Sequence, residues 1–104
     1  MEVNQIKQEL SQVEQVIQQA AEAIEDDGAA SQELRDCVNE LDKQSRKARQ
    51  AKDAKRLIQF VEDMEATSDR AKNACEHTYN LKSQTKSAVL QAHNQLSDLK
   101  HQLH

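Results

Sequence analysis

The sequence has few of the residues that make turns and few aromatic residues. Its 104 residues include no proline, no tryptophan and one glycine, Gly28, and its only aromatic residues are Phe60 and Tyr79. A sheet needs several turns, which glycine and proline commonly supply, and its strands favour aromatic and β-branched residues. A chain with one glycine and no proline cannot supply those turns. We therefore predict an all-α protein.

Long hydrophobic runs are also absent. No stretch approaches the roughly 18 consecutive apolar residues of a transmembrane helix, so we expect no membrane-spanning segment. The first five residues, Met1 to Gln5, contain neither the basic region nor the apolar core of a signal peptide. We therefore expect a cytoplasmic protein.

Cysteine and large apolar residues are scarce as well. Cys37 and Cys75 are too few for a disulfide framework and form no CxxC motif, so we predict buried, reduced thiols. Leucine, isoleucine, valine and phenylalanine together account for 20 of the 104 residues. This fraction lies near the limit of about 20% below which chains are typically disordered. We therefore expect burial between copies to complete the core.

The apolar residues that are present predict helices. In the first helix, expected at residues 2–26, they alternate in steps of three and four, which is a coiled-coil pattern. They are Val3, Ile6, Leu10, Val13, Ile17, Ala20 and Ile24. We expect this helix to end at Gly28 in a left-handed conformation, with Asp27 or Ser31 capping the next helix.

The apolar residues of the middle segment change face. Leu34, Val38 and Leu41 share one side of a helix. At 100° per residue, a second apolar group lies about 120° to 180° around the helix from that side, and it consists of Leu57, Val61 and Met64. Either the chain bends between residues 42 and 53, or one helix shows different faces to different partners. Without glycine or proline in this stretch, we favour the unbroken helix.

The hydroxyl and carboxylate side chains of residues 66–69 suggest the next turn. We therefore predict one helical domain over residues 1–104, an up-down-up antiparallel three-helix bundle that resembles a coiled coil, with helices at about 2–26, 30–65 and 69–103. In this arrangement Cys37 and Cys75 lie about 30 Å apart. The alternative is a helical hairpin with one very long C-terminal helix, because a heptad spacing continues from residue 57 to residue 103.

An apolar tip follows from the three-helix arrangement. The first helix is the shortest, so it leaves the far end of the second helix uncovered, and uncovered apolar clusters usually mark contact surfaces. The tip consists of Leu57, Ile58, Phe60, Val61 and Met64. We expect it to bind a partner helix or a second copy of the chain.

Charge is unevenly distributed along the chain. Residues 1–42 carry a net charge of −9, residues 43–56 of +6 and residues 57–104 of −1. The basic residues of the middle segment are Lys43, Arg46, Lys47, Arg49, Lys52, Lys55 and Arg56. Arg46, Lys47, Arg49, Lys52 and Arg56 are candidates for contact with an anionic partner. Nucleic-acid binding is therefore the alternative function, but these side chains point around the helix and the whole chain is acidic, which favours a solvated band.

The sequence offers no pattern typical of an enzyme. It lacks a glycine-rich phosphate loop and the HExxH and GxSxG motifs, so we expect no catalysis, cofactor or small-molecule substrate. His93, His101 and His104 share roughly one side of the last helix, but no residue supplies a convincing third or fourth ligand, so we predict no metal site. These observations favour a non-enzymatic helical interaction or scaffold module.

Overall fold

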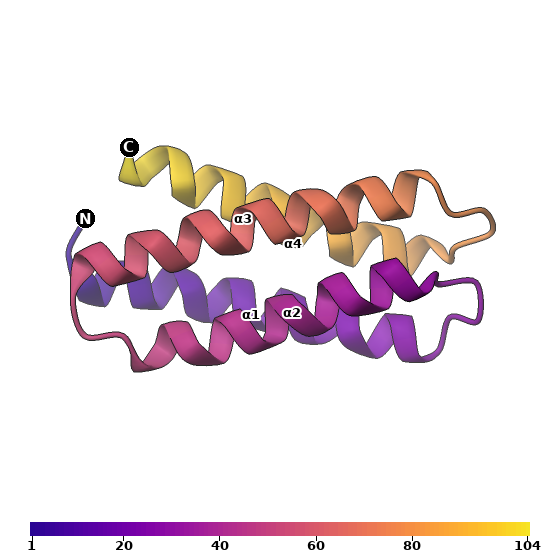
Figure 1. The fold of residues 1–104 in the computed structure, drawn as a ribbon, viewed down its shortest axis with the longest axis horizontal. Coiled ribbons are helices and arrows are strands. Elements are labelled where there is room, and N and C mark those ends of the chain that lie inside the picture. Colours follow the sequence, from indigo (N-terminus) through magenta and orange to yellow (C-terminus); the bar gives the residue numbers. More distant parts are fainter.

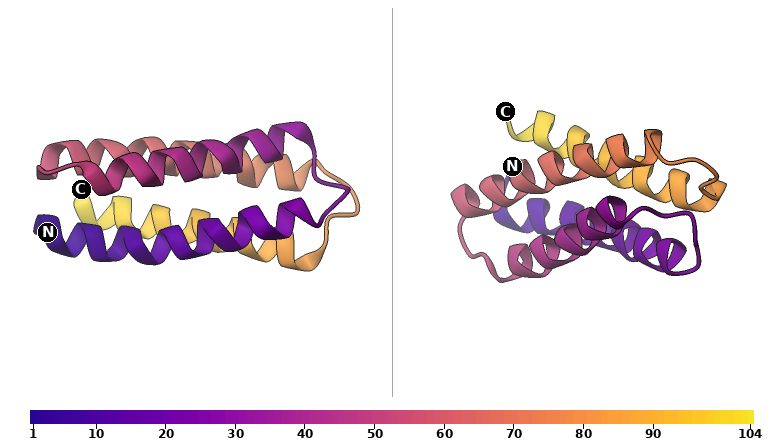
Figure 2. Two further views of the ribbon diagram at one scale, coloured as in Figure 1. Left: turned by 90° about the horizontal axis from the view of Figure 1, so that it is seen from below. Right: turned by 45° about the vertical axis from the view of Figure 1, so that its right-hand side comes forward.

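Four helices form the chain in a computed structural model that describes residues 1–104. They are α1 (Val3–Glu25), α2 (Gln32–Gln50), α3 (Ala54–Glu76) and α4 (Ser83–Leu103). They run up, down, up and down in a bundle of 41 × 21 × 18 Å (Figure 1). The α1–α2 and α3–α4 loops lie at one end, and both termini lie at the other (Figure 2). The all-α prediction is confirmed, but the three-helix bundle and the long C-terminal helix are both wrong.

The extra turn lies at residues 51–53, where we expected an unbroken helix. Ala51 adopts an extended conformation, with φ −68° and ψ 139°. The Asp53 carboxylate then caps α3 by accepting a hydrogen bond from the Arg56 backbone N–H at 2.8 Å. The change of apolar face therefore marks a turn between two helices, each of which presents one face to the core.

The turn expected at residues 66–69 does not form, because the hydroxyl groups there bond within their own helix. The Thr67 hydroxyl donates to the Asp63 carbonyl at 3.0 Å, and the Ser68 hydroxyl donates to the Glu65 carbonyl at 2.7 Å. Both side chains are buried and satisfied in this way. The helix α3 therefore continues through this segment to Glu76.

The core closes within one chain. A cluster of 14 buried residues, including Ile6, Leu57 and Leu96, fills the end of the bundle near the termini, and a second cluster of 11, including Leu34, fills the loop end. The four helices have similar lengths, 23, 19, 23 and 21 residues. No helix therefore extends far beyond its neighbours. None of them has the length and apolar character needed to cross a lipid bilayer.

Gly28 does not adopt the left-handed conformation that we expected. Its φ is not positive, and a Cβ atom added to it would meet nothing within 4 Å. The helix α1 ends near the predicted position, with Asp26 as its C-cap. Ser31 caps α2 as predicted, because its hydroxyl accepts a hydrogen bond from the Leu34 backbone N–H at 3.2 Å.

Replacing Gly28 with alanine is therefore expected to stabilise the protein. Alanine fits the observed backbone and reduces the conformational entropy of the unfolded chain, which should raise the free energy of unfolding by about 0.4–1 kcal/mol. Urea unfolding followed by circular dichroism measures this difference. A loss of about 1 kcal/mol instead would indicate that Gly28 does need a left-handed backbone.

Candidate functional site

The loop end of the bundle is held together by one buried carboxylate, that of Asp27 in the α1–α2 loop. Its side chain is 2% exposed. Its Oδ2 atom accepts hydrogen bonds from the Lys82 backbone N–H at 2.9 Å and from the Thr85 hydroxyl at 2.8 Å, and its Oδ1 atom accepts one from the Ala29 backbone N–H at 3.1 Å. The Lys82 side chain makes no capping bond to its own helix. Asp27 therefore caps α4 from a distant part of the chain.

Charge strengthens this link. The backbone N–H of Lys82 and the hydroxyl of Thr85 donate to the carboxylate and lower the pKa of Asp27 below its usual value, against the opposing effect of burial. A negative charge at the N-terminus of a helix is also favoured by the helix dipole. The Lys82 ammonium group adds a second link by donating to the Asp26 carbonyl at 2.7 Å. The two loops are therefore joined by both side chains and backbone.

The lowered pKa of Asp27 predicts a pH-dependent contribution to stability. The ionised carboxylate stabilises the fold fully above the unfolded-state pKa of about 3.9, and this contribution is lost as pH falls through the lower folded-state pKa. We expect Asp27→Asn to lower the melting temperature by several degrees at pH 7. Thermal unfolding at pH 7 and in acid should show the difference from wild type shrinking as pH falls.

Asp26→Asn is the matched control, because the Asp26 side chain is exposed and accepts no hydrogen bond in the structure. It should leave the melting temperature nearly unchanged. Equal effects of the two substitutions would contradict the role of Asp27.

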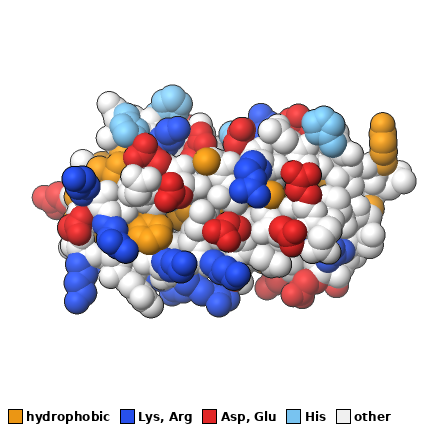
Figure 3. Space-filling model, in the orientation of Figure 1, with side chains coloured by type: hydrophobic (Ala, Val, Ile, Leu, Met, Phe, Trp, Pro, Cys, Tyr) orange, Lys and Arg blue, Asp and Glu red, His pale blue; other side chains and the backbone are white.

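The α3–α4 loop (residues 77–82) holds Tyr79 in an exposed position on an ordered turn. Tyr79 is 88% exposed, and Asn80 beside it adopts a left-handed conformation with φ 67°. On one side of Tyr79, the Thr78 hydroxyl donates to the Ala74 carbonyl at 2.6 Å. On the other side, Leu81 is buried and Lys82 is bound to Asp27. Figure 3 shows an apolar side chain projecting from this end of the bundle.

A groove of about 330 Å³ lies beside this tyrosine, and we call it the Tyr79 groove. It is lined by Lys72, Cys75, Glu76, Thr78, Tyr79, Asn80, Lys86 and Leu90. Leu90 is 40% exposed. The groove therefore combines two exposed large side chains with two lysines and one glutamate. We did not predict this groove from the sequence, although a single tyrosine followed by asparagine in a polar segment is a signal of an exposed turn.

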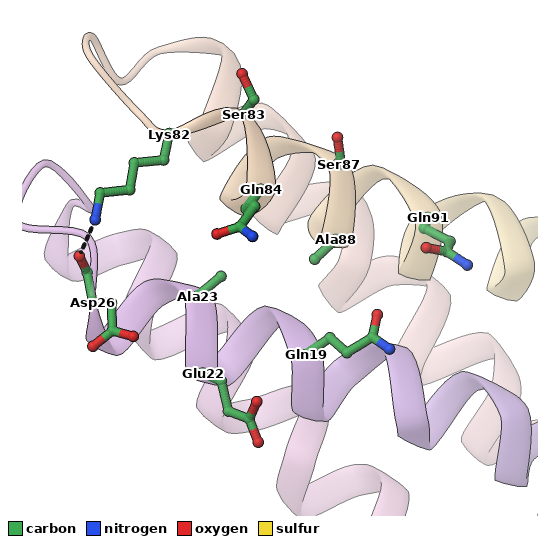
Figure 4. Close-up of a pocket in the computed structure, with 10 residues that line it drawn as sticks. All are labelled: Gln19, Glu22, Ala23, Asp26, Lys82, Ser83, Gln84, Ser87, Ala88 and Gln91. Carbon is green, nitrogen blue, oxygen red and sulfur yellow. Dashed lines mark hydrogen bonds between the residues drawn. The ribbon is translucent and has the colours of Figure 1, made fainter.

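A second, more polar groove of about 600 Å³ lies between α1 and α4. It is lined by Gln19, Glu22, Ala23, Asp26, Lys82, Ser83, Gln84, Ser87, Ala88 and Gln91. Figure 4 shows Gln84 and Ala88 of α4 pointing toward Ala23 of α1, and the Lys82 side chain bonded to Asp26. Amides, hydroxyls and methyl groups dominate its surface. Its one cationic side chain is already bonded to backbone, so the free charges of this groove are the exposed carboxylates of Glu22 and Asp26.

The residues of the apolar tip do not form one surface. Leu57, Val61 and Met64 are 0% exposed and belong to the core. Ile58 and Phe60 are half-buried, and two positions along a helix place their side chains about 200° apart. The prediction of an uncovered apolar tip is therefore wrong. The helices α1 and α4 reach the end of the bundle that the three-helix arrangement left open.

The basic residues of the 43–56 segment do gather at one end of the bundle, around the turn between α2 and α3. Arg46 pairs with Asp42 at 2.7 Å, and Arg49 pairs with Glu14 at 2.7 Å. The remaining five are exposed and make no ion pair within the chain, namely Lys43, Lys47, Lys52, Lys55 and Arg56. Figure 3 shows lysine and arginine side chains concentrated over this end.

Two of the three histidines considered as metal ligands lie against carboxylates of α3. The His93 Nε2 atom is 3.4 Å from Asp69, and the His104 Nε2 atom is 3.7 Å from Glu62. His101 is exposed in the last turn of α4. No group of three histidine, cysteine or acidic residues is arranged to hold a metal ion.

Both cysteines are buried and free, and they belong to the same core cluster. The expected separation of about 30 Å was wrong because it relied on the three-helix arrangement. Burial raises the pKa of the Cys37 thiol and raises that of Cys75 to about 11. Both thiols are therefore protonated and weakly nucleophilic at neutral pH.

We expect both thiols to react slowly with a disulfide reagent such as dithionitrobenzoate in the native protein at pH 7. The thiolate is the reactive form, and burial limits both its population and its access. Two thiols per chain should react rapidly after denaturation in urea. Rapid reaction of either thiol in the native protein would contradict its burial.

Comparison of the chain with family models, with curated proteins and with solved structures finds no match.

Proposed function

We propose that the chain is a non-enzymatic helical interaction module that binds an acidic partner helix in the Tyr79 groove. The exposure of Tyr79 carries this proposal, because its side chain is 88% exposed on a turn that is bonded on both sides. A folded chain gains little by holding a large aromatic ring in water. An interface gains much more, because tyrosine buries a large area and loses little conformational freedom.

Leu90 supports the same surface. It lies on α4, is 40% exposed, and lines the groove together with Tyr79 from the preceding loop. The only other large apolar side chain that is exposed is Met1, at the opposite end of the bundle. Two of the three exposed large apolar residues therefore share one groove, which is the arrangement expected at the centre of a contact surface.

Charge determines the kind of partner that we propose. Lys72 and Lys86 lie among the residues that line the groove, together with one acidic residue, Glu76. Neither lysine makes an ion pair within the chain. A helix with an apolar stripe for Tyr79 and Leu90, flanked by glutamates for the two lysines, complements this surface.

An anionic partner at the basic end of the bundle is the second candidate function. The five exposed basic residues without ion pairs around the α2–α3 turn favour it. Nucleic acid would bind such a surface through its phosphates, and its affinity would fall steeply with rising salt. No aromatic side chain is exposed there to stack on bases, since Phe60 is only half-exposed and packs against the core.

Nuclear magnetic resonance titration of the labelled chain tests the first candidate. The probe is a synthetic helical peptide with leucines at i, i+4 and i+7 and glutamates on the flanking positions. We expect it to shift the backbone amide signals of Tyr79, Lys86 and Leu90. Tyr79→Ala should weaken its binding about tenfold or more, as expected for a central contact residue.

Two controls sharpen this titration. A peptide with lysine in place of each glutamate should bind weakly, and Met1→Ala should leave binding of the acidic peptide unchanged. No signal change at millimolar acidic peptide, or changes confined to other residues, would disprove the groove as the contact site. A short DNA duplex that instead shifts residues 43–56 in low salt would favour the second candidate.

A further inference from the structure

The outer face of α2 carries a continuous stripe of exposed polar residues that we call the α2 stripe. Its residues follow one another in alternating steps of three and four, so they fall within about 100° of the helix surface. They are Glu33, Asp36, Glu40, Lys43, Lys47 and Gln50, and all six are exposed. The opposite face of α2, which includes Leu34, Val38 and Leu41, lies in the core. The stripe therefore faces directly away from the bundle.

Charge is segregated along this stripe. Its first half is acidic, and its second half contains two lysines followed by a neutral glutamine. Figure 3 shows the same order along the lower edge of the bundle, where basic side chains at one end give way to acidic ones at the other. The outer faces of α1 and α4 are different, because they consist largely of glutamine, asparagine and serine, such as Gln8 and Gln15 on α1 and Gln91 on α4.

The charges of the α2 stripe are not neutralised within the chain. The ion pairs of α2 are made by Asp42, Arg46 and Arg49, which lie off the stripe. Within the stripe, the only side-chain bond is the one that Asp36 accepts from the Gln32 amide at 2.8 Å. Glu33, Glu40 and both lysines are therefore free to contact another molecule.

The order of charges along the α2 stripe is complementary to that of a second copy whose α2 helix runs in the opposite direction. We propose that two copies of the chain associate through their α2 helices, antiparallel, about a twofold axis that passes between Glu40 and Lys43. Glu40 then faces Lys43 of the second copy, and Asp36 faces Lys47 of the second copy. The axis repeats both pairs, so four ion pairs form, as a self-complementary twofold interface requires. A parallel arrangement would instead place like charges opposite each other.

This association deepens the proposed function, since it rests on the chain being an interaction module and names a second copy as one partner. It uses α2, whereas the Tyr79 groove lies between α3 and α4, so both surfaces can be occupied at once. Exposed ion pairs are individually weak and are screened by salt. The dimer is therefore weak, and its dissociation constant rises with salt.

Analytical ultracentrifugation of the full chain tests this association. The screening length is about 30 Å in about 10 mM salt and about 3 Å in about 1 M salt. We expect a reversible dimer in the lower salt and a monomer in the higher. The double variants Lys43→Glu/Lys47→Glu and Asp36→Lys/Glu40→Lys each give positions 36, 40, 43 and 47 the same sign of charge, and each should weaken self-association about tenfold or more.

Mixing the two double variants tests whether contact between the α2 stripes holds the two copies together. All four opposite-charge pairs form again between the two variants, so the heterodimer should form more tightly than either variant associates with itself. Lys52→Glu/Lys55→Glu is the matched control, because it changes the net charge as much as Lys43→Glu/Lys47→Glu but lies beyond the end of α2. It should weaken the dimer much less.

A wild-type monomer at millimolar concentration in low salt would overturn this inference but would leave peptide binding in the Tyr79 groove untouched. A dimer that survives both stripe variants, or variants that fail to pair when mixed, would also overturn it. Loss of peptide binding with the dimer intact would instead disprove only the groove.

Discussion

The hydrogen bond from the Lys82 backbone N–H to the buried Asp27 carboxylate is the contact on which the loop end of the bundle depends. It joins two loops that are 55 residues apart in the sequence and supplies the cap that α4 cannot make with its own side chain. The Thr85 hydroxyl shares the same carboxylate oxygen, so the start of α4 is fixed at two points. An unpartnered carboxylate in this position would be costly to bury. The polar link is therefore favourable only when both loops are in place.

If Tyr79 is a contact residue, as we propose, the link between Asp27 and Lys82 also matters for binding. Leu81 enters the core directly before Lys82, and Tyr79 stands two residues earlier in the exposed part of the loop. Fixing Lys82 therefore limits the positions that the tyrosine can adopt. A contact residue that is already held in place loses less conformational entropy on binding than a contact residue in a mobile loop.

The sequence predicted the helical class and the end of α1, but not the number of helices. The change of apolar face between Leu41 and Leu57 was the correct signal of a turn, and Asp53 supplied the cap, yet the absence of glycine and proline there argued for an unbroken helix. Thr67 and Ser68 predicted a turn that does not form, because local propensity cannot show that their hydroxyls bond to their own helix. The residue that adopts a left-handed conformation is Asn80 in the α3–α4 loop, whereas we expected Gly28 to do so in the α1–α2 loop. The partner of Asp27 could not be predicted, because it lies 55 residues away.

Hydrogen exchange at the Lys82 amide tests the central claim most directly. This amide lies outside the hydrogen-bonded part of α4, and its acceptor is the Asp27 carboxylate. If the two loops are held together as described, the Lys82 amide should exchange nearly as slowly as the amides in the core of α4. The reason is that the Lys82 amide and the α4 amides then become exposed to water only when the bundle itself unfolds. Exchange at the rate of a solvent-exposed loop amide would show that the link between Asp27 and Lys82 does not hold this end of the protein.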